Sequence, residues 1–463
     1  MVLFSSGASS SSGGAATGTL ESIVSEVTSS TSNRTLSNLL KTHVTSSTSN
    51  RTLSNLLKTH VKSEIGETIL ASTLGGGQDP LTVLDAYANT LGFLYIMTAR
   101  LITAGSAPVP LTVIDNFCRT FDPDAARLAG DRITILAKAI INLTENQNQL
   151  HAAILPLLNL ITRFPPSLSY MTTIHPHFVH ACVKTQHYTA ALPVLNVPIS
   201  EIDISLTPLT TEDVLKYHYV GSLALLGLKR FEEAAEFLEV VVSAPAQHHP
   251  AAIQLEALKK LVLIQLILHG ATQPLPRYIH ASLYRYLKST AYVSLSKAFP
   301  RTSALNEVLT KEQRVFETDC NLGLVRQVLD HAPRWSIRKL TATYVTLSLE
   351  EIGKAILIQD VATVKNIVLS MIEKGEIRAS LDTSGTVTFL EDEVTYTPAD
   401  VDRLLRAAQA QGSVLSEADR VMGRSKDFLS KAIRDKDGHH GPSIAEEELF
   451  GAPGLRDWDE GGF

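Results

Sequence analysis

The spacing of apolar residues changes between residues 334 and 390, where intervals of three and four give way to alternation. The segment RWSIRKLTATYVTLSLEE is predicted to form a helix with its apolar side chains close to one face. These side chains are Ile337, Leu340, Tyr344, Leu347 and Leu349. The segment VATVKNIVLSMIEKGE repeats the helical spacing and meets Gly375, which is placed to stop that helix.

A short helix and a hairpin complete this region. Ser348 precedes Leu349, Glu350 and Glu351, and a serine oxygen followed by acidic residues is typical of a helix start. The segment EIRASLDTSGTVTFL alternates on both sides of a polar DTSG turn, which predicts a β-hairpin. Three helices followed by a hairpin outline a winged-helix module, which we assign to residues 334–390.

Residues 63–333 are predicted to form a helical-repeat arm. Segments rich in glycine and proline divide this region into helices of the length typical of stacked helix pairs. These segments are GGGQDP, GSAPVP, FDPD, RFPPS and NVPISEIDISLTP. One helix pair resembles the tetratricopeptide (TPR) pattern through Tyr217, Val220, Gly221, Phe237, Val240 and Pro245. Ala224 and Glu233 depart from that pattern, so a helix pair is predicted and a strict repeat is left open.

The N-terminal region contains an exact internal copy. Residues 1–27 are rich in serine and glycine and are predicted to be disordered. The sequence TSSTSNRTLSNLLKTHV then occupies residues 28–44 and returns unchanged at 45–61. A solenoid repeat keeps only its structural positions, whereas this copy also keeps its surface residues, so we interpret it as a tandem duplication. One copy is predicted to form a short helix around Leu36, Leu39 and Leu40, and the other to lengthen it or loop out.

The C-terminal region contains a long amphipathic helix, predicted over residues 398–434. Its apolar stripe includes Leu404, Leu415, Met422 and Leu429, which belong to a series of apolar residues spaced alternately by three and four and broken by polar Gln411 and Ser425. Leu405, Val421, Phe428 and Ile433 widen the stripe, and that width favours a multi-helix bundle over a simple dimer. The acidic, glycine-rich residues 435–463 are predicted to be a flexible tail.

Composition and net charge exclude only a few classes of function. The chain has 463 residues, a formal net charge of −6 and a sequence pI of about 6.2, which argues against a dedicated binder of nucleic acid or membrane surfaces. No apolar run is long enough to cross a bilayer, and LVLIQLILHG is predicted to be a buried helix. Cys118, Cys182 and Cys320 lie far apart, without the spacing of a metal site or a disulfide framework.

The run I-x-x-L-T-x-x-Y-x-x-L-S-L-x-x-I, from Ile337 to Ile352, resembles the signature of PCI domains. These winged-helix modules lie at the ends of scaffold subunits in the proteasome lid, the signalosome and a translation initiation factor. Upstream, GLKRFEEA, QPLPRY and NLGLVRQVL are similar to the third-subunit family of the COP-nine signalosome.

This resemblance implies a mostly α-helical chain with a TPR-like solenoid, a PCI winged helix carrying a small hairpin, and a long C-terminal helix. It implies a non-catalytic subunit of a complex that deneddylates cullins and thereby regulates cullin-RING ligases, with the zinc site in another subunit. Partners would be other PCI subunits and MPN-domain subunits, with cullin-RING ligases as further, indirect partners; direct contact with these ligases is left open. Nucleic acid, membranes and cofactors are not expected, and the expected location is nucleus and cytoplasm.

The resemblance also implies which residues meet partners. PCI subunits align their winged helices side by side and gather their C-terminal helices into one bundle. The outer wing strand is assigned to Thr386, Val387, Thr388 and Phe389, and the bundle contacts are assigned to Leu404, Leu415, Met422 and Leu429. The alternative for each residue is a place in the chain's own core, above all for Val387 and Phe389, whose side chains share one face.

The segment IHPHFVHAC is the strongest candidate for catalytic chemistry. His175 and His177 match the start of an H-x-H, seven residues, S-x-x-D zinc motif. Thr185 and Tyr188 stand where serine and aspartate are required, so the ligand set is incomplete. The sequence has no nucleophile elbow, Walker lysine loop or dinucleotide fingerprint. We therefore predict no catalytic or metal site in this chain.

Two other functions remain open from the sequence. A proteasome-lid or translation-initiation-factor PCI subunit would share the architecture. A winged-helix nucleic-acid-binding protein would use its third helix, but that helix has only Lys365 and Lys374, with Glu373 and Glu376 beside the second lysine. Binding to phosphates needs a concentrated basic face, which favours protein contacts instead.

Overall fold

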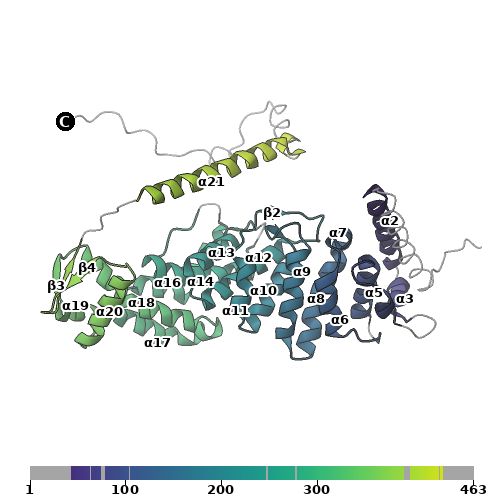
Figure 1. Ribbon diagram of the computed structural model, residues 1–463. Helices are drawn as coiled ribbons and strands as arrows, with labels where there is room; N and C mark the ends of the chain where they lie inside the picture. Colours follow the sequence, from purple (N-terminus) through teal and green to yellow (C-terminus); the bar gives the residue numbers. More distant parts are fainter. Residues whose placement is uncertain are drawn as a thin grey trace, which may run out of the picture. The chain divides into compact units, whose positions relative to one another are not determined.

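The computed structural model describes residues 43–62, 64–73, 79–103, 105–246, 249–276, 279–390, 397–426 and 428–430. The chain divides into two compact units, Met1–Phe389 and Leu390–Phe463. Both units are mostly helical in their described parts (Figure 1). The predictions of a disordered start (1–27), of a helix around Leu36 in the first copy, and of a flexible tail (435–463) lie outside the described residues.

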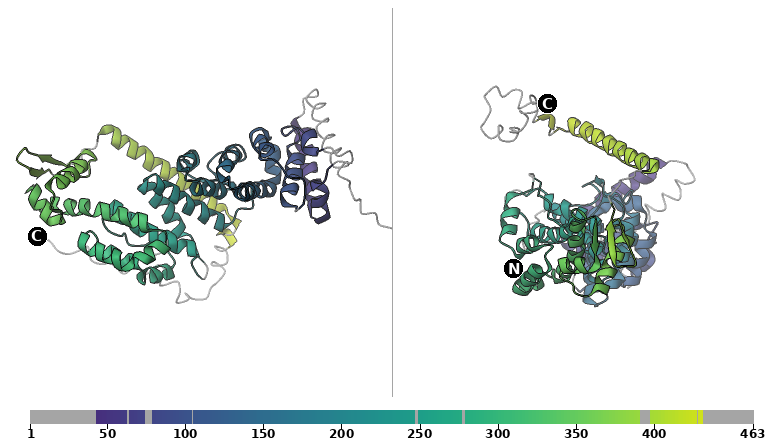
Figure 2. Two further views of the ribbon diagram at one scale, coloured as in Figure 1. Left: turned by 90° about the horizontal axis from the view of Figure 1, so that it is seen from below. Right: turned by 90° about the vertical axis from the view of Figure 1, so that its left-hand side faces the viewer.

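The first unit begins as an array of helices stacked side by side in chain order (Figures 1 and 2), and most of its apolar side chains form one continuous core. The elements of this arm are α2 (His43–Val61), α3 (Glu64–Ala71), α4 (Pro80–Val83), α5 (Thr90–Ile102), α6 (Leu111–Thr120), α7 (Pro123–Ala126), η1 (Arg127–Ala129), α8 (Gly130–Asn146), η2 (Leu150–Ala153), α9 (Ile154–Arg163), β1 (Tyr170–Met171), α10 (Ile174–Lys184), α11 (Tyr188–Leu195), β2 (Glu201–Ile202), α12 (Thr211–Gly227), α13 (Phe231–Ser243), α14 (Ala252–His269), α15 (Ala281–Lys288), α16 (Ala291–Ala298), α17 (Thr302–Thr318) and α18 (Leu322–Thr341). The predicted helical arm is confirmed.

The TPR-like pair is formed by α12 and α13. A capping box between Thr210 and Asp213 starts α12, because each residue's side chain accepts from the other's backbone N–H. Gly221 lies against Phe237, and a Cβ at Gly221 would come within 2.9 Å of that ring. The absent side chain therefore lets the two helices pack closely, and Pro245 follows directly after α13 and its cap.

The apolar run from Leu261 lies in α14, where residues 260–267 are all buried. This confirms the predicted buried helix. Among the described residues, no single helix is both long and apolar enough to span a bilayer.

The winged-helix module follows the arm. It comprises the end of α18, then β3 (Thr346–Ser348), α19 (Leu349–Ile356), α20 (Val361–Glu373), β4 (Ala379–Leu381) and β5 (Thr386–Phe389). The first helix differs from the prediction: it begins at Leu322, well before Arg334, and ends at Thr341. Tyr344 therefore lies beyond the helix and Leu347 lies in a strand, because the segment after Thr341 pairs with the hairpin.

The other predicted features of the module are confirmed. Ser348 caps α19 in a capping box with Glu351. Gly375 follows α20 with a φ of +70°, a left-handed conformation that glycine adopts without strain. The hairpin forms from β4 and β5, and Gly385 in its turn also has a positive φ.

The second unit contains α21 (Pro398–Arg424), which starts with a capping box between Thr397 and Asp400. The predicted continuous helix is interrupted: α21 ends at Arg424, residues 426 and 428–430 are helical again, and residues 431–434 lie outside the described part of the chain. Ser425 leaves helical geometry with a ψ of 138°, and its hydroxyl accepts a hydrogen bond from the Phe428 N–H. Serine competes for backbone hydrogen bonds in this way, which makes it a frequent helix boundary.

Candidate protein-interaction surfaces

Helix α21 carries an apolar stripe on an exposed surface. Leu404, Leu415 and Met422 are 55%, 66% and 55% exposed, and no residue of α21 is buried. Leu429, in the helical residues after the break at Ser425, is also exposed. Ion pairs such as Arg403–Asp400 and Arg420–Glu417 occupy other positions along the helix. A contiguous apolar stripe on an exposed helix is typical of a surface that binds another protein.

The sheet of the module corrects the position of the predicted outer wing strand. β5 pairs with β4 on one side and with β3 on the other, so Thr386–Phe389 is the central strand. The assignment of an outer strand to these residues is therefore wrong. Val387 and Phe389 are buried in the module's own core, whereas Thr386 and Thr388 are half-buried on the other face. A direct role of these four residues in partner binding stays a prediction.

The outer edges of the sheet belong to β3 and β4. On the two sides of β3, the Val345 carbonyl accepts a hydrogen bond from the Phe389 N–H at 2.8 Å, and the Leu349 N–H donates to the Gly385 carbonyl at 3.0 Å. Backbone groups alternate in direction along a strand, so the backbone groups of Thr346 point away from β5. Tyr344 and Val345 are exposed beside this edge.

Sequence reasoning missed this edge because β3 lies within a segment of helical spacing. The signal was the run TYVTLS, which contains four β-branched or aromatic residues among six. Such residues favour strands, but a strand of three residues is too short to set a period of its own.

The long helix α18 belongs to both the arm and the module. Val325, Val328 and Ala332 pack in the arm core, whereas Ile337 packs in the core of the module. Between them, the Trp335 indole Nε1–H donates to the Ile267 carbonyl of α14 at 2.9 Å. Arg334 lies next to it and pairs with Glu376 at 2.6 Å. The helix thus holds the module in a defined orientation on the arm.

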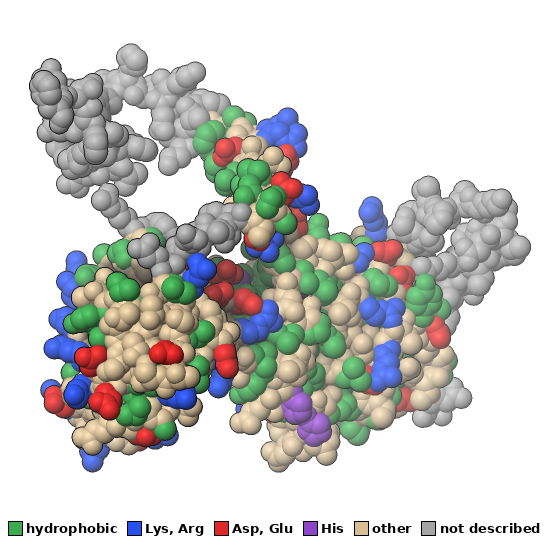
Figure 3. All heavy atoms as spheres, turned by 60° about the vertical axis from the view of Figure 1, so that its left-hand side comes forward, with side chains coloured by type: hydrophobic (Ala, Val, Ile, Leu, Met, Phe, Trp, Pro, Cys, Tyr) green, Lys and Arg blue, Asp and Glu red, His purple; other side chains and the backbone are tan. Residues whose placement is uncertain are grey.

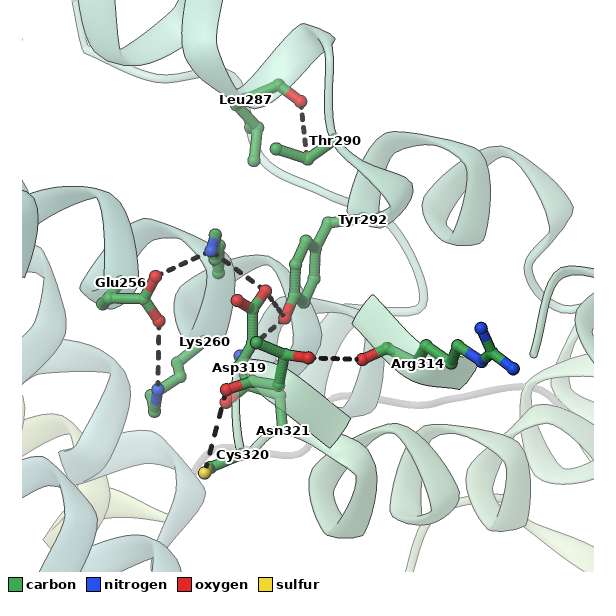
Figure 4. Close-up of polar contacts among 11 residues, drawn as sticks. Glu256, Lys260, Leu287, Thr290, Tyr292, Arg314, Asp319, Cys320 and Asn321 are labelled. Atoms are coloured by element: carbon green, nitrogen blue, oxygen red, sulfur yellow. Dashed lines mark hydrogen bonds and ion pairs between the residues drawn. The ribbon is translucent and has the colours of Figure 1, made fainter. Parts of the chain in front are cut away.

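A polar network fixes the start of α18 (Figure 4). The Lys259 ammonium on α14 pairs with Glu256 at 2.7 Å and with Asp319, just before α18, at 2.9 Å. The Tyr292 hydroxyl donates to the same Asp319 carboxylate and accepts from the Asn321 amide. Burial lowers the pKa of Lys259, but the two carboxylates outweigh it and the pKa lies above its usual value. The ammonium therefore stays charged, and the network ties α14 and α16 to the turn that begins α18.

The histidine cluster is part of the arm core. His175 is fully buried, its ring meets the Tyr217 ring edge-on at 5.4 Å, and its Nδ1 accepts from the Thr172 N–H at 3.1 Å. Thr185 donates to the Ala181 carbonyl of its own helix, and the ring of Tyr188 lies against Gly227 of α12. Within the described residues, no group of three His, Cys, Asp or Glu side chains is placed to hold a metal ion.

Burial lowers the pKa of His175 and of His177 to about 4. In the folded chain both rings stay neutral at pH 5, whereas in the unfolded chain each takes up a proton near pH 6.5. The unfolded state then binds more protons, so we expect the free energy of unfolding to fall as the pH drops from 6.5 toward 4. The loss approaches about 1.4 kcal/mol per histidine for each pH unit, and the contribution is constant above this window.

Urea unfolding at pH 7.5, 6.0 and 5.0 measures this dependence. A variant carrying His175→Gln and His177→Gln is the control, because glutamine does not titrate, and its dependence on pH should be shallower. An equal slope in both proteins would show that these histidines do not carry the effect.

The charge of the surface does not favour nucleic acid. On the face shown in Figure 3, basic and acidic side chains are interspersed, with hydrophobic side chains among them. In α20, the third helix of the module, Lys365 is the one basic residue between Val361 and Glu373. A phosphate backbone is bound by clustered positive charge, which this helix does not offer.

Comparison with known proteins agrees with this architecture. Residues 50–282 match the family model described as "COP9 signalosome complex subunit 3, N-terminal helical repeats", and residues 304–391 match the PCI domain. The chain is 30% identical over 381 residues to COP9 signalosome complex subunit 3 of Arabidopsis thaliana, covering 78% of this chain and 85% of the relative. It is 28% identical over 371 residues to the protein of the same name in Dictyostelium discoideum, covering 77% and 88%.

Proposed function

The chain belongs to the family of COP9 signalosome complex subunit 3, and from this membership we propose that it is a non-catalytic scaffold subunit of that complex. The observation that carries the proposal is the exposed apolar stripe of α21, which has the width of a helix that packs in a bundle of several helices. The names of the relatives favour the signalosome over a proteasome lid or an initiation factor.

The neighbours in this proposal are other PCI subunits and MPN-domain subunits. The assembly would remove the ubiquitin-like modifier from cullins, in nucleus and cytoplasm, with a zinc site supplied by another subunit. The part of this chain is to hold its neighbours in place. Helix α18 supports that role, because it continues from the arm core into the module core without a break.

Reconstitution tests the proposed function. Cullin deconjugation is measured on the complex assembled with this chain, on the remaining subunits without it, and on the chain alone. We expect activity in the complex, less activity when the chain is left out, and none in the chain alone. Deconjugation by the isolated chain would overturn the scaffold assignment.

The module would meet a neighbouring PCI module through its β3 edge. At this edge the backbone groups of Thr346 point away from β5 and have no strand partner among the described residues, and the exposed side chains of Tyr344 and Val345 lie beside it. A free strand edge with apolar flanks can accept a strand from a second protein.

The variant Thr346→Pro is expected to weaken this contact at least tenfold while the module stays folded. Proline removes the N–H that points away from β5 and leaves the β3–β5 hydrogen bonds in place. Binding of the full chain to partner subunits is measured by bio-layer interferometry, and folding is measured by circular dichroism. Thr346→Val is the matched control, because it keeps the N–H. Equal affinity of the proline and valine variants would exclude the β3 edge.

A further inference from the structure

The duplicated segment contributes a helix that is docked on the arm. The second copy, residues 45–61, makes up most of α2. Leu57 is fully buried, and Leu53 and Ser54 are nearly so. The Ser54 hydroxyl donates to the Leu128 carbonyl of η1 at 3.2 Å. Helix α2 is therefore held by a leucine, a serine and a second leucine at spacing L-S-x-x-L.

The first copy carries the same docking residues. Leu36, Ser37 and Leu40 stand at the positions of Leu53, Ser54 and Leu57 in an identical sequence. Helix α2 contacts η1, α3 and α5, and the side chains that it buries, Leu53, Ser54 and Leu57, all have counterparts in the first copy. We propose that this surface of η1, α3 and α5 is a binding site for residues 28–44 as well, and that the two copies compete for it within one chain.

The length of the connection decides which copy is bound. With the second copy docked, Lys62 and Ser63 join α2 to α3. With the first copy docked, residues 45–63 would form the connection. Closing a longer loop costs entropy in proportion to the logarithm of its length, which favours the second copy on the order of thirty-fold. The second copy therefore holds the site, and the first copy takes over when the second cannot bind.

Deletion cannot separate the two copies. Removing residues 45–61 gives the same polypeptide as removing residues 28–44, because the copies are identical and adjacent. The shortened chain keeps one docking segment joined directly to Lys62, so its Tm should equal that of the full chain within about 2 °C. Point substitutions are required, and they also give the two copies different masses.

The test is hydrogen exchange with mass spectrometry on full-length variants. In Leu53→Glu/Leu57→Glu, the second copy cannot be buried, and amides of residues 36–44 should exchange at least tenfold more slowly than in a matched control. That control is Asn55→Glu/Thr59→Glu, which places two charges on exposed positions of the same helix. In Leu36→Glu/Leu40→Glu the second copy stays protected. With all four leucines replaced, neither copy is protected and α5 exchanges faster.

Two results would overturn the proposal. One is that Leu53→Glu/Leu57→Glu behaves like the fourfold variant, with no protection in residues 36–44. The other is that protection of residues 36–44 rises with protein concentration and light scattering detects dimers, because the first copy would then bind a second chain.

Discussion

Replacing Leu415 and Met422 by glutamate is expected to lower the affinity of the chain for its complex at least a thousandfold. Residues 43–389 should stay folded. Both side chains are exposed in the isolated chain, so the charges remain in water there. In a helical bundle the same positions would be buried, and an unpaired buried charge costs several kcal/mol. Co-purification of tagged full-length chain with partner subunits measures the loss, and thermal unfolding checks the fold.

The matched control is Gln409→Glu/Ser413→Glu. These residues lie on the opposite side of α21 at helical periodicity, are exposed, and receive the same added charge. We expect this variant to co-purify as the unaltered chain does. If both variants co-purify normally, the stripe is not an interface. If neither variant co-purifies, the added negative charge anywhere on the helix disrupts binding, and the stripe is not specifically required.

Gly130→Ala is expected to lower the free energy of unfolding of the arm by about 3 kcal/mol. Gly130 begins α8, and a Cβ at this position would overlap the carbonyl oxygen of Leu206. Backbone atoms cannot rotate away as a side chain does, so the loop at Leu206 or α8 itself must shift. Urea unfolding followed by far-ultraviolet circular dichroism measures the change.

Gly323→Ala is the control for this prediction. Gly323 lies in the first turn of α18, and a Cβ there would meet no atom within 4 Å. Alanine has the higher helix propensity, so this variant should be neutral or more stable by up to about 1 kcal/mol. Equal effects of the two substitutions would mean that contact with Leu206 does not limit the packing of α8.

Local signals in the sequence located most of the module correctly. The Ser348 cap, the periodic α20 and the DTSG turn each depend on residues close in sequence, and each is found where it was predicted. The third strand was missed because β3 gains its hydrogen bonds from β5, about 40 residues later. The beginning of α18 was missed because Pro333, which usually disrupts a helix, is accommodated within it.

The candidate surfaces were predictable to different degrees. Periodicity alone placed Leu404, Leu415 and Met422 on one stripe, and the structure shows that stripe exposed. Periodicity could not separate a central strand from an edge strand, so Thr386–Phe389 was placed on the wrong side of the sheet. The docking of residues 45–61 was also beyond sequence reasoning, because two identical copies give no signal that distinguishes them.

The central claim is that this chain is a structural subunit of the signalosome. The most direct measurement is affinity purification of the tagged full chain from its own cells, with mass spectrometry of the partners and a cullin-deconjugation assay on the eluate. We predict recovery of other PCI subunits, a zinc isopeptidase and cullins, with activity in the eluate. Recovery of proteasome ATPases, or of the chain alone with nucleic acid, would contradict the account.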